Sequence, residues 1–416
     1  MLFSYGVLCG VKLLFFGLSG KYYHICYMGK MSLVSLAVLS LISASCAGPV
    51  ENNPLDHYWD ESYSGELGFH ASGADQRLLT LAGKPLYISG VNCYNLFLQC
   101  FEKDSMRTTE MEETVKVLAR QEVPVVRFSC GPYYATQMNW YTDYRDEYMA
   151  DLERLASLCD ENHILLIPSF FWNSACVPAF KGEELAAWGD KTSGTYSFMV
   201  SYTEDIVNAL KDHKCVAAWE FGNEFNLQAD IESEGFPPLP AAAVGTAAQG
   251  FGETVRAHDP HGRLVLSGYS VMRNSQWNLE KKNGWVLDTF DQYVEITGVM
   301  TPDSVDGMSE HIYEEKRAFE GIGELDRESQ LAKAKEAAAR LGKVYYVGEF
   351  TGPKTAIGDT TLLKSHFSAY LNQGIQLSLI WNYALRGDVE WSFKEGDYDD
   401  IAFRLIREFN NQFKEE

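Results

Sequence analysis

Two glutamates in this chain follow short apolar runs and have neighbours that suit acid–base chemistry. Glu224 closes the segment Trp-Glu-Phe-Gly-Asn-Glu, and Glu349 lies far downstream in Val-Gly-Glu-Phe. Other apolar runs also end in polar or aromatic residues, namely Arg127, Asn223, His311, Tyr313 and Trp381. Such groups do not help an apolar core, because burying a polar or charged group without a partner costs free energy. Their pattern therefore indicates a site that uses two carboxyl groups.

Eight short runs, rich in apolar residues, must position these side chains. They cover residues 86–92, 123–128, 164–170, 216–221, 263–266, 304–311, 344–348 and 375–381. Segments in which apolar residues recur with the spacing of an α-helix lie between or after these runs, at 108–121, 147–162, 196–213, 241–258, 328–341, 360–372 and 401–414. Strands that alternate with helices predict an α/β fold with a parallel sheet, and eight strands can close a (β/α)8 TIM barrel.

The remaining segments complete the predicted organisation. Residues 68–84 are expected to form an N-terminal β-hairpin that plugs the barrel bottom, and 226–240 and 271–303 to be long connections. We expect a leader at 1–46, a short linker at 47–67 and a catalytic domain at 68–416. A doubly wound open sheet is the alternative, but neither a G-x-G-x-x-G nor a Walker A sequence follows any of the runs, so nucleotide binding lacks support.

In a TIM barrel the C-terminal ends of the strands meet at one rim, where reactive groups lie. Two facing carboxyl groups at such a rim suit glycoside hydrolysis, in which one donates a proton and the other attacks or directs water. Arg127 would keep the nucleophile ionised by lowering its pKa. Asn223 can bind a sugar 2-hydroxyl, and Trp381 offers a flat stacking surface. Tyr313 can orient the nucleophile, and His311 can lie beside the acid.

The segments VVRFS, WEFGNE, EHIY, VGEF and LIWNY, in this order, resemble glycoside hydrolase family 5, the cellulase/mannanase superfamily of clan A. The resemblance covers roughly residues 68–413. It implies a retaining double displacement without a cofactor or a metal, with Glu224 as acid/base and Glu349 as nucleophile. The supporting and sugar-binding positions that it implies are Arg127, Asn223, His311, Tyr313, Trp381 and, at the end of the first strand, Asn92.

One position departs from the family pattern. Where the family often has a histidine after the third strand, this chain has Pro-Ser-Phe-Phe-Trp, ending at Trp172. An aromatic surface there leaves the substrate open between β-1,4-linked mannan and glucan, and endo and exo action also stay open. Trp172 is included among the expected substrate-binding residues. A carbohydrate-binding barrel without turnover is the alternative class, and a barrel esterase or metallohydrolase ranks below it.

Other residues near the motifs have plainer interpretations. Glu220 lies an even number of residues before Glu224, so both would point to the same face of the strand. We interpret Glu220 as a buried structural carboxylate one layer below the rim. Several aromatic residues are either sugar platforms or parts of a core, and the sequence does not decide between the two for Trp140, Tyr141, Tyr144, Trp172, Trp188 and Trp391.

The chain of 416 residues carries a formal net charge of −22, and 13% of its residues are aromatic. A surface this acidic repels phosphate backbones, so nucleic acid is a poor partner. The aromatic surplus suits a polysaccharide or oligosaccharide substrate. We expect a monomer.

The first acidic residue is Glu51, and the chain before it has the pattern of a secretory leader. Lys30 precedes an apolar run of about a dozen residues that small residues close, which is too short to span a membrane. Ser-Ala-Ser-Cys, ending at Cys46, resembles a lipobox with serine in the usual leucine position. Lipidation of Cys46 and plain cleavage near Ala47 both stay open. A start at Met28 or Met31 also stays open, as does the alternative that the whole stretch is a membrane anchor. We expect a secreted, outer-surface or periplasmic protein. If Cys46 is lipidated, the protein would be anchored to the membrane by that lipid.

The chain has nine cysteines, six of them after the leader. Their spacing includes neither a CxxC pair nor a histidine and cysteine pattern typical of zinc, so a structural zinc site is not expected. Cys93 and Cys100 are close enough in sequence to form a bridge. Buried free thiols are the favoured interpretation, because several cysteines lie in apolar runs.

Overall fold

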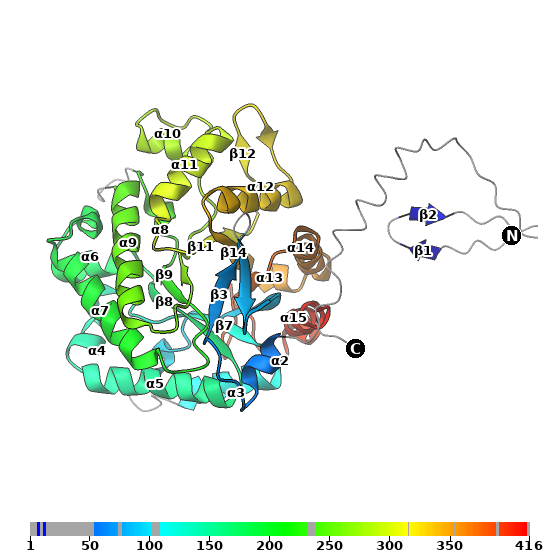
Figure 1. Ribbon diagram of the computed structural model, residues 1–416, viewed down its shortest axis with the longest axis horizontal. Coiled ribbons are helices and arrows are strands. Elements are labelled where there is room, and N and C mark those ends of the chain that lie inside the picture. Colours follow the sequence, from blue (N-terminus) through cyan, green and yellow to red (C-terminus); the bar gives the residue numbers. More distant parts are fainter. Residues whose placement is uncertain are drawn as a thin grey trace, which may run out of the picture. The chain divides into compact units, whose positions relative to one another are not determined.

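Eight parallel strands form the barrel (Figure 1). They are β6 (Ile88–Asn92), β7 (Val125–Ser129), β8 (Leu165–Phe171), β9 (Trp219–Gly222), β10 (Val265–Leu266), β11 (Gly307–Ile312), β14 (Val344–Thr351) and β15 (Leu377–Trp381). Each strand pairs with the next along the chain, and β15 pairs with β6 to close the ring. The predicted fold class is confirmed, and all eight predicted runs contain a strand.

The computed structural model describes residues 54–73, 77–101, 109–231, 238–314, 316–352, 354–387 and 391–413. It also describes two short strands, β1 (Gly6–Leu8) and β2 (Val11–Leu13), which pair antiparallel. These two belong to a separate unit, Met1–Pro49, and everything that follows concerns the unit Val50–Glu416. The predicted leader otherwise lies outside the described residues, so it stays a prediction.

One long helix follows each barrel strand. These helices are α3 (Thr109–Arg120), α5 (Arg145–Glu161), α7 (Gly194–Leu210), α9 (Ala241–His258), α11 (Phe290–Met300), α12 (Arg327–Arg340), α14 (Thr360–Gln373) and α15 (Ile401–Asn411). Shorter elements are α2 (Pro54–Trp59), α4 (Asn139–Thr142), α6 (Cys176–Lys181), α8 (Phe225–Gln228), α10 (Gln276–Glu280), α13 (Lys354–Ile357), β12 (Ala318–Phe319) and β13 (Gly323–Glu324). Seven of the eight long helices match the predicted segments.

Helix α11 corrects the prediction that 271–303 is a long connection. Its buried face repeats every three or four residues, through Phe290, Tyr293, Ile296 and Met300. Thr289 caps its N-terminus by accepting a hydrogen bond from the backbone N–H of Gln292, whose side chain bonds back to Thr289. This reciprocal cap was readable in the sequence. β-Branched residues and Gly298 weaken the helical signal, and packing on the barrel offsets that weakness.

Most residues of the strands are apolar because both faces of a parallel sheet are covered, and charged residues such as Arg127 and Glu220 are the exceptions. All five residues of β7 and all seven of β8 are buried. The surrounding helices begin and end at residues that satisfy their free backbone groups. Asp326 accepts the backbone N–H of Ser329 at the start of α12, and Gly374 takes the left-handed conformation that ends α14.

A small antiparallel sheet closes the end of the barrel at which the strands begin. Strands β3 (Phe69–Ser72) and β4 (Leu78–Leu81) form the predicted hairpin, and β5 (Lys84–Pro85) adds a third strand. The backbone N–H of Phe69 donates to the carbonyl oxygen of Ala217, and that of Leu264 donates to Phe69. Because residues 217 and 264 come just before β9 and β10, the sheet covers the N-terminal ends of the strands.

Residues 54–67 differ from the linker that the sequence indicates. They include α2, in which Tyr58 is fully buried. The Tyr58 hydroxyl donates to the carbonyl oxygen of Lys214 at 2.5 Å and accepts the backbone N–H of Gly68 at 3.1 Å. The unit that contains the barrel therefore begins before residue 68, because this segment packs on the barrel bottom.

The six cysteines of the described barrel unit are buried thiols, as favoured, and Cys93 and Cys100 do not form a bridge with each other. Burial raises the pKa of the Cys93 thiol, which keeps it protonated and inert. Among the described residues, we find no helix with both the length and the apolar character needed to cross a bilayer.

Candidate active site

Both predicted carboxylates lie at one cavity of about 590 Å³. Glu224 follows β9 and takes a left-handed backbone conformation (φ 54°), and its N–H donates to the carbonyl oxygen of Gly268 at 2.9 Å. Glu349 lies near the end of β14 and is 3% exposed. The cavity is lined by Tyr94, Leu98, Tyr133, Tyr134, Gln137, Trp172, Asn223, Glu224, Tyr313, Glu349, Trp381, Asn382 and Trp391. The two carboxylates, which are distant in sequence, therefore face one space.

His311 lies between the two carboxylates. Its Nδ1 is 2.9 Å from Oε1 of Glu224 and 3.4 Å from Oε1 of Glu349. One carboxylate oxygen of each glutamate and this nitrogen lie within 4.8 Å of one another. Nε2 of His311 is buried without a hydrogen-bond partner in the part of the chain that the structure describes. A neutral imidazole therefore places its hydrogen on Nδ1, from which it donates to Glu224.

Arg127 is fully buried below the cavity and binds Glu349 directly. Its Nη1 donates to Oε1 of Glu349 at 2.7 Å and to Oδ1 of Asn92 at 2.9 Å, and its Nη2 donates to Oδ1 of Asn223 at 2.9 Å. Its Nε donates to Glu220 at 2.7 Å, and Nη2 is also 2.7 Å from that carboxylate. Hydrogen bonds thus join Nε, Nη1 and Nη2 of the guanidinium to acceptors, and Nη2 also forms an ion pair with Glu220.

The electrostatic environment makes the two carboxyl groups unlike. Burial raises the pKa of Glu349 above its ordinary value, against the lowering effects of His311 and Arg127. Burial also acts on Glu224, but the hydrogen bond and charge of His311 outweigh it and lower the pKa of Glu224. Two carboxylates this close repel each other, so the pair titrates as a coupled unit with two macroscopic pKa values.

An aromatic surface forms another part of the cavity wall. The ring of Trp381 stacks against Tyr94, with centroids 5.9 Å apart, and against Trp172 at 6.0 Å. The Arg127 guanidinium lies over the Trp172 ring, 4.5 Å from its centroid. This cation–π contact fixes the Trp172 ring and places the aromatic surface next to the carboxylates.

The structure brings all nine predicted site residues together, seven of them at or beside the cavity and two beneath it. Asn223, Tyr313, Trp381 and Trp172 line the cavity as expected, and His311 lies just behind the carboxylates.

Arg127, expected to act on the nucleophile, and Asn92, expected among the supporting and sugar-binding positions, are fully buried beneath the cavity. The Asn92 amide nitrogen donates to the carbonyl oxygen of Gly348 at 3.0 Å, and its oxygen accepts from Arg127. The hydrogen-bonding groups of both residues are therefore already used within the protein.

Several cavity residues were missed by the sequence interpretation. Tyr133 and Tyr134 follow β7 and line the cavity, and the Tyr134 side chain is 59% exposed. Their position directly after a strand end was the signal that could have identified them. Trp391 also lines the cavity, with its ring perpendicular to Tyr313 at 6.0 Å, whereas Trp188 is fully buried in the core. Of the loop aromatics, Trp140 stacks on Phe101 away from the cavity.

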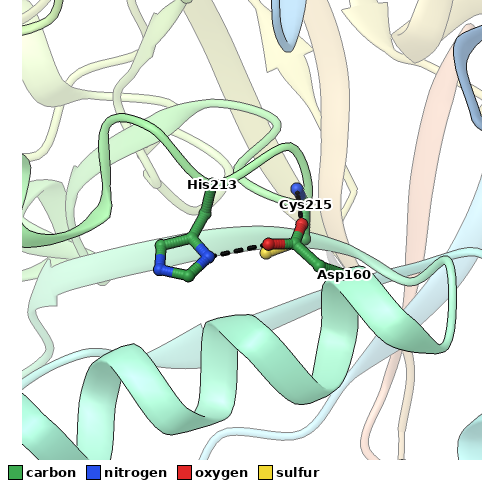
Figure 2. A group of neighbouring side chains, drawn as sticks. All are labelled: Asp160, His213 and Cys215. Atoms are coloured by element: carbon green, nitrogen blue, oxygen red, sulfur yellow. Dashed lines mark hydrogen bonds and ion pairs between the residues drawn. The ribbon is translucent and has the colours of Figure 1, made fainter. Parts of the chain in front are cut away.

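A second group of metal-binding residue types lies at the other end of the barrel (Figure 2). Asp160 at the end of α5 meets His213 and Cys215, which come just before β9, and their ligand-type atoms lie within 4.8 Å of one another. Asp160 Oδ1 accepts the backbone N–H of Cys215 at 2.6 Å, and Oδ2 contacts Nδ1 of His213 at 2.7 Å. Burial raises the pKa of the Cys215 thiol well above its usual value. We interpret the group as a clamp that positions the start of β9.

Replacing Asp160 by alanine should therefore destabilise the fold. The buried N–H of Cys215 would lose its acceptor, at a cost of about 2 kcal/mol in the free energy of unfolding. Urea unfolding followed by circular dichroism measures this cost. Glu161→Ala, at the exposed neighbouring position of the same helix, serves as the control and should change stability by less than about 0.5 kcal/mol. Equal stability of the two variants would contradict the clamp.

Comparison with known proteins bears on the fold. Neither a family model nor a curated protein sequence matches this chain. A solved endo-1,4-β-mannanase from Rhizomucor miehei aligns with a TM-score of 0.62 and 17% identity, over 84% of this chain and 100% of that one. The catalytic domain of a Thermobifida fusca endoglucanase aligns with a TM-score of 0.52 and 14% identity, over 86% and 100%. An exo-β-1,4-mannosidase from an Opitutaceae bacterium aligns with a TM-score of 0.57 and 15% identity, over 83% of this chain and 63% of that one. At such identities, these likenesses show that the barrel fold is shared.

Proposed function

We propose that this protein is a retaining β-glycosidase of the cellulase/mannanase type that cleaves β-1,4-linked mannan or glucan. One observation carries the proposal: oxygens of Glu224 and Glu349 lie within 4.8 Å of one another and face the same cavity. Retaining enzymes hold their carboxyl groups about 5 Å apart, whereas inverting enzymes need roughly 6.5–9.5 Å to admit a water molecule. The narrow spacing favours direct attack by a carboxylate.

In the first step, Glu349 attacks the anomeric carbon while Glu224 donates its proton to the leaving oxygen. The bond to the leaving sugar breaks, and a covalent glycosyl–Glu349 ester forms. Arg127 and Tyr313 both donate to Glu349, the latter at 2.5 Å, which suits an ionised nucleophile. The side chain of Glu224 is 27% exposed and lines the cavity, so it can reach the leaving oxygen. Burial raises the pKa of Glu349 and His311 lowers that of Glu224 in the empty site, so the assigned roles require the shared proton to lie on Glu224 once a sugar is bound.

In the second step, Glu224 acts as a base. It takes a proton from water, the water oxygen attacks the anomeric carbon, and the ester bond to Glu349 breaks. His311 keeps its hydrogen on Nδ1 and donates to Glu224, which stabilises the carboxylate form between the two steps. The anomeric configuration is inverted twice and is therefore retained.

The substrate class rests on the aromatic wall and on the neighbouring structures. Trp381, Tyr94 and Trp172 offer flat surfaces against which the apolar face of a pyranose can stack. The aligned solved proteins are named as a mannanase and an endoglucanase, which supports β-1,4-linked mannan or glucan as substrate. The aligned exo-mannosidase supports the alternative of exo action on oligosaccharides.

The proposal includes the place of action. The leader suggests that the enzyme works outside the cytoplasm, as a secreted or surface protein that acts as a monomer, with lipid on Cys46 if the lipobox is used. A polymeric sugar substrate is compatible with that location.

A reducing-end release assay on a panel of polymers tests the function. The panel contains β-1,4-mannan, glucomannan, carboxymethylcellulose, xylan and β-1,3-glucan, followed by aryl β-glycosides for exo action. We expect release from mannan or glucan by the parent and its loss in Glu349→Ala. Proton NMR of the first product should show the β-anomer. An α-anomer would exclude retention, and sugar binding without release from any substrate would favour the non-catalytic barrel.

A further inference from the structure

Glu220 lies in β9 below the cavity and is fully buried. Both of its oxygens accept hydrogen bonds from Nε of Arg127, at 2.7 and 3.0 Å. The Tyr346 hydroxyl donates to its Oε2 at 3.0 Å. Both oxygens of this carboxyl group accept hydrogen bonds from N–H or O–H groups. A proton on either oxygen would point at the hydrogen of a donor, so the arrangement suits the ionised carboxylate. Glu220 is thus a buried carboxylate that does not line the cavity.

Arg127 is the link between Glu220 and the reacting carboxylate. Glu220 accepts the Nε–H of the guanidinium and forms an ion pair with Nη2, while Nη1 donates to Glu349. The guanidinium is planar, so holding its Nε edge also determines where Nη1 points. The same plane lies over the Trp172 ring, so a rotation of Arg127 would also displace the aromatic wall.

The charges show a second consequence of this arrangement. One guanidinium serves two carboxylates, Glu220 and Glu349, and both salt bridges to it measure 2.7 Å. Burial lowers the pKa of Arg127, but the charges of Glu220 and Glu349 outweigh it and raise that pKa. Glu220 therefore neutralises much of the positive charge that Glu349 would otherwise receive alone, and a less stabilised carboxylate is a stronger nucleophile.

We propose that Glu220 is a positioning residue for the reaction, which aims Arg127 at Glu349 and limits the positive charge that Glu349 experiences. This inference rests on the proposed function. It goes beyond it by assigning a role in turnover to a carboxylate that does not touch the cavity.

Glu220→Gln tests the role of the charge. The amide can still hold part of the Arg127 edge, but the positive charge then acts on Glu349 alone. Its ionised form becomes more stable, so the acid limb of kcat/KM moves to lower pH, by about one unit. The weaker nucleophile lowers kcat by roughly 10-fold or more. Both are measured with an aryl β-glycoside from pH 3 to 9.

The groups that face Glu349 come from several elements and are the same in parent and variant. Arg127 reaches it from β7, His311 and Tyr313 from β11 and the segment after it, and Glu224 from the end of β9. A shift in the acid limb therefore reports the loss of the Glu220 charge.

Two further variants separate positioning from stability. Glu220→Asp keeps the charge but shortens the side chain, so kcat should fall while the acid limb stays where the parent has it. Asp259→Asn breaks the buried pair with Arg263, at 2.8 Å, near the barrel bottom. It should lower Tm and leave the pH profile unchanged. An acid limb that stays in place in Glu220→Gln, or moves equally in Asp259→Asn, would overturn the proposal. If Glu220→Gln does not fold, unchanged kcat in Glu220→Asp would overturn it.

A direct titration separates this inference from the proposed function. With glutamate labelled by carbon-13 at Cδ, the Glu349 resonance is identified as the one missing in Glu349→Gln. It should titrate at lower pH in Glu220→Gln than in the parent. If the parent cleaves none of the glycosides, the proposed function fails, and this titration still decides whether Glu220 controls the charge at Glu349.

Discussion

Replacing Glu349 by alanine is expected to lower kcat by about 10⁵-fold on every glycoside that the parent protein cleaves. Without the carboxylate, no covalent ester can form, and the remaining groups only bind and polarise the sugar. The fold should persist, because Arg127 keeps its pairing with Glu220 at 2.7 Å. Steady-state kinetics on aryl β-glycosides measures the loss, and thermal unfolding followed by circular dichroism checks the fold.

The stereochemistry of rescue identifies the role of Glu349. The cavity left by the alanine admits azide, which would attack from the same side as the missing carboxylate and release an α-glycosyl azide. Glu204→Ala, an exposed carboxylate on α7, is the control and should keep the kcat of the parent. Turnover close to normal in Glu349→Ala, or a β-glycosyl azide from it, would remove Glu349 as the nucleophile.

Replacing Glu224 by alanine should lower kcat/KM about 10³-fold for substrates with a poor leaving group, such as a sugar hydroxyl. An aryl glycoside with a dinitrophenolate leaving group needs little protonation, so its first step should be nearly unaffected. The ester on Glu349 should then accumulate, because the base for the second step is gone. Rapid-quench mass spectrometry detects this ester as a mass increase of one glycosyl group.

The pH profile gives an independent check of Glu224. In the parent, the basic limb of kcat/KM reports loss of the proton of the acid, so activity falls as pH rises. That limb should disappear in Glu224→Ala. Azide should now attack the accumulated ester and release a β-glycosyl azide, the opposite anomer to that expected from Glu349→Ala. A basic limb that persists in Glu224→Ala would assign the acid to another residue.

The order of elements could be predicted because each barrel element carries a local signal. The runs that became β7 and β8 are mostly apolar, with Arg127 and Ser169 among the exceptions, since a parallel sheet is covered on both faces. Helix α11 was missed because its period is mixed with β-branched residues and Gly298, and its capping box at Thr289 was overlooked. Helix α2 was missed because it is short, and contacts distant in sequence, such as that of Tyr58 with Lys214, 156 residues away, show that it packs on the barrel.

The site could be predicted as a set of residues, but the roles of some could not. Arg127 lies within β7 and Asn92 ends β6, and the structure buries both, whereas Asn223 follows β9 and lies on the cavity wall. Where a side chain lies across the barrel depends on strand register, for example on the shift in pairing between β11 and β14 at Glu310 and His311. Such a register cannot be predicted from a single sequence.

The sequence by itself determined the types of the reactive groups and the barrel end at which they lie, because strand-end position is a local property of the chain. Only the tertiary structure decided distance, burial and charge balance. Arg127 binds Glu349 across 222 residues of sequence and Glu220 across 93. Closure of the barrel brings these three together in a medium of low dielectric constant, where charge interactions are strong. There, one arginine shared by two carboxylates determines how strongly Glu349 is stabilised.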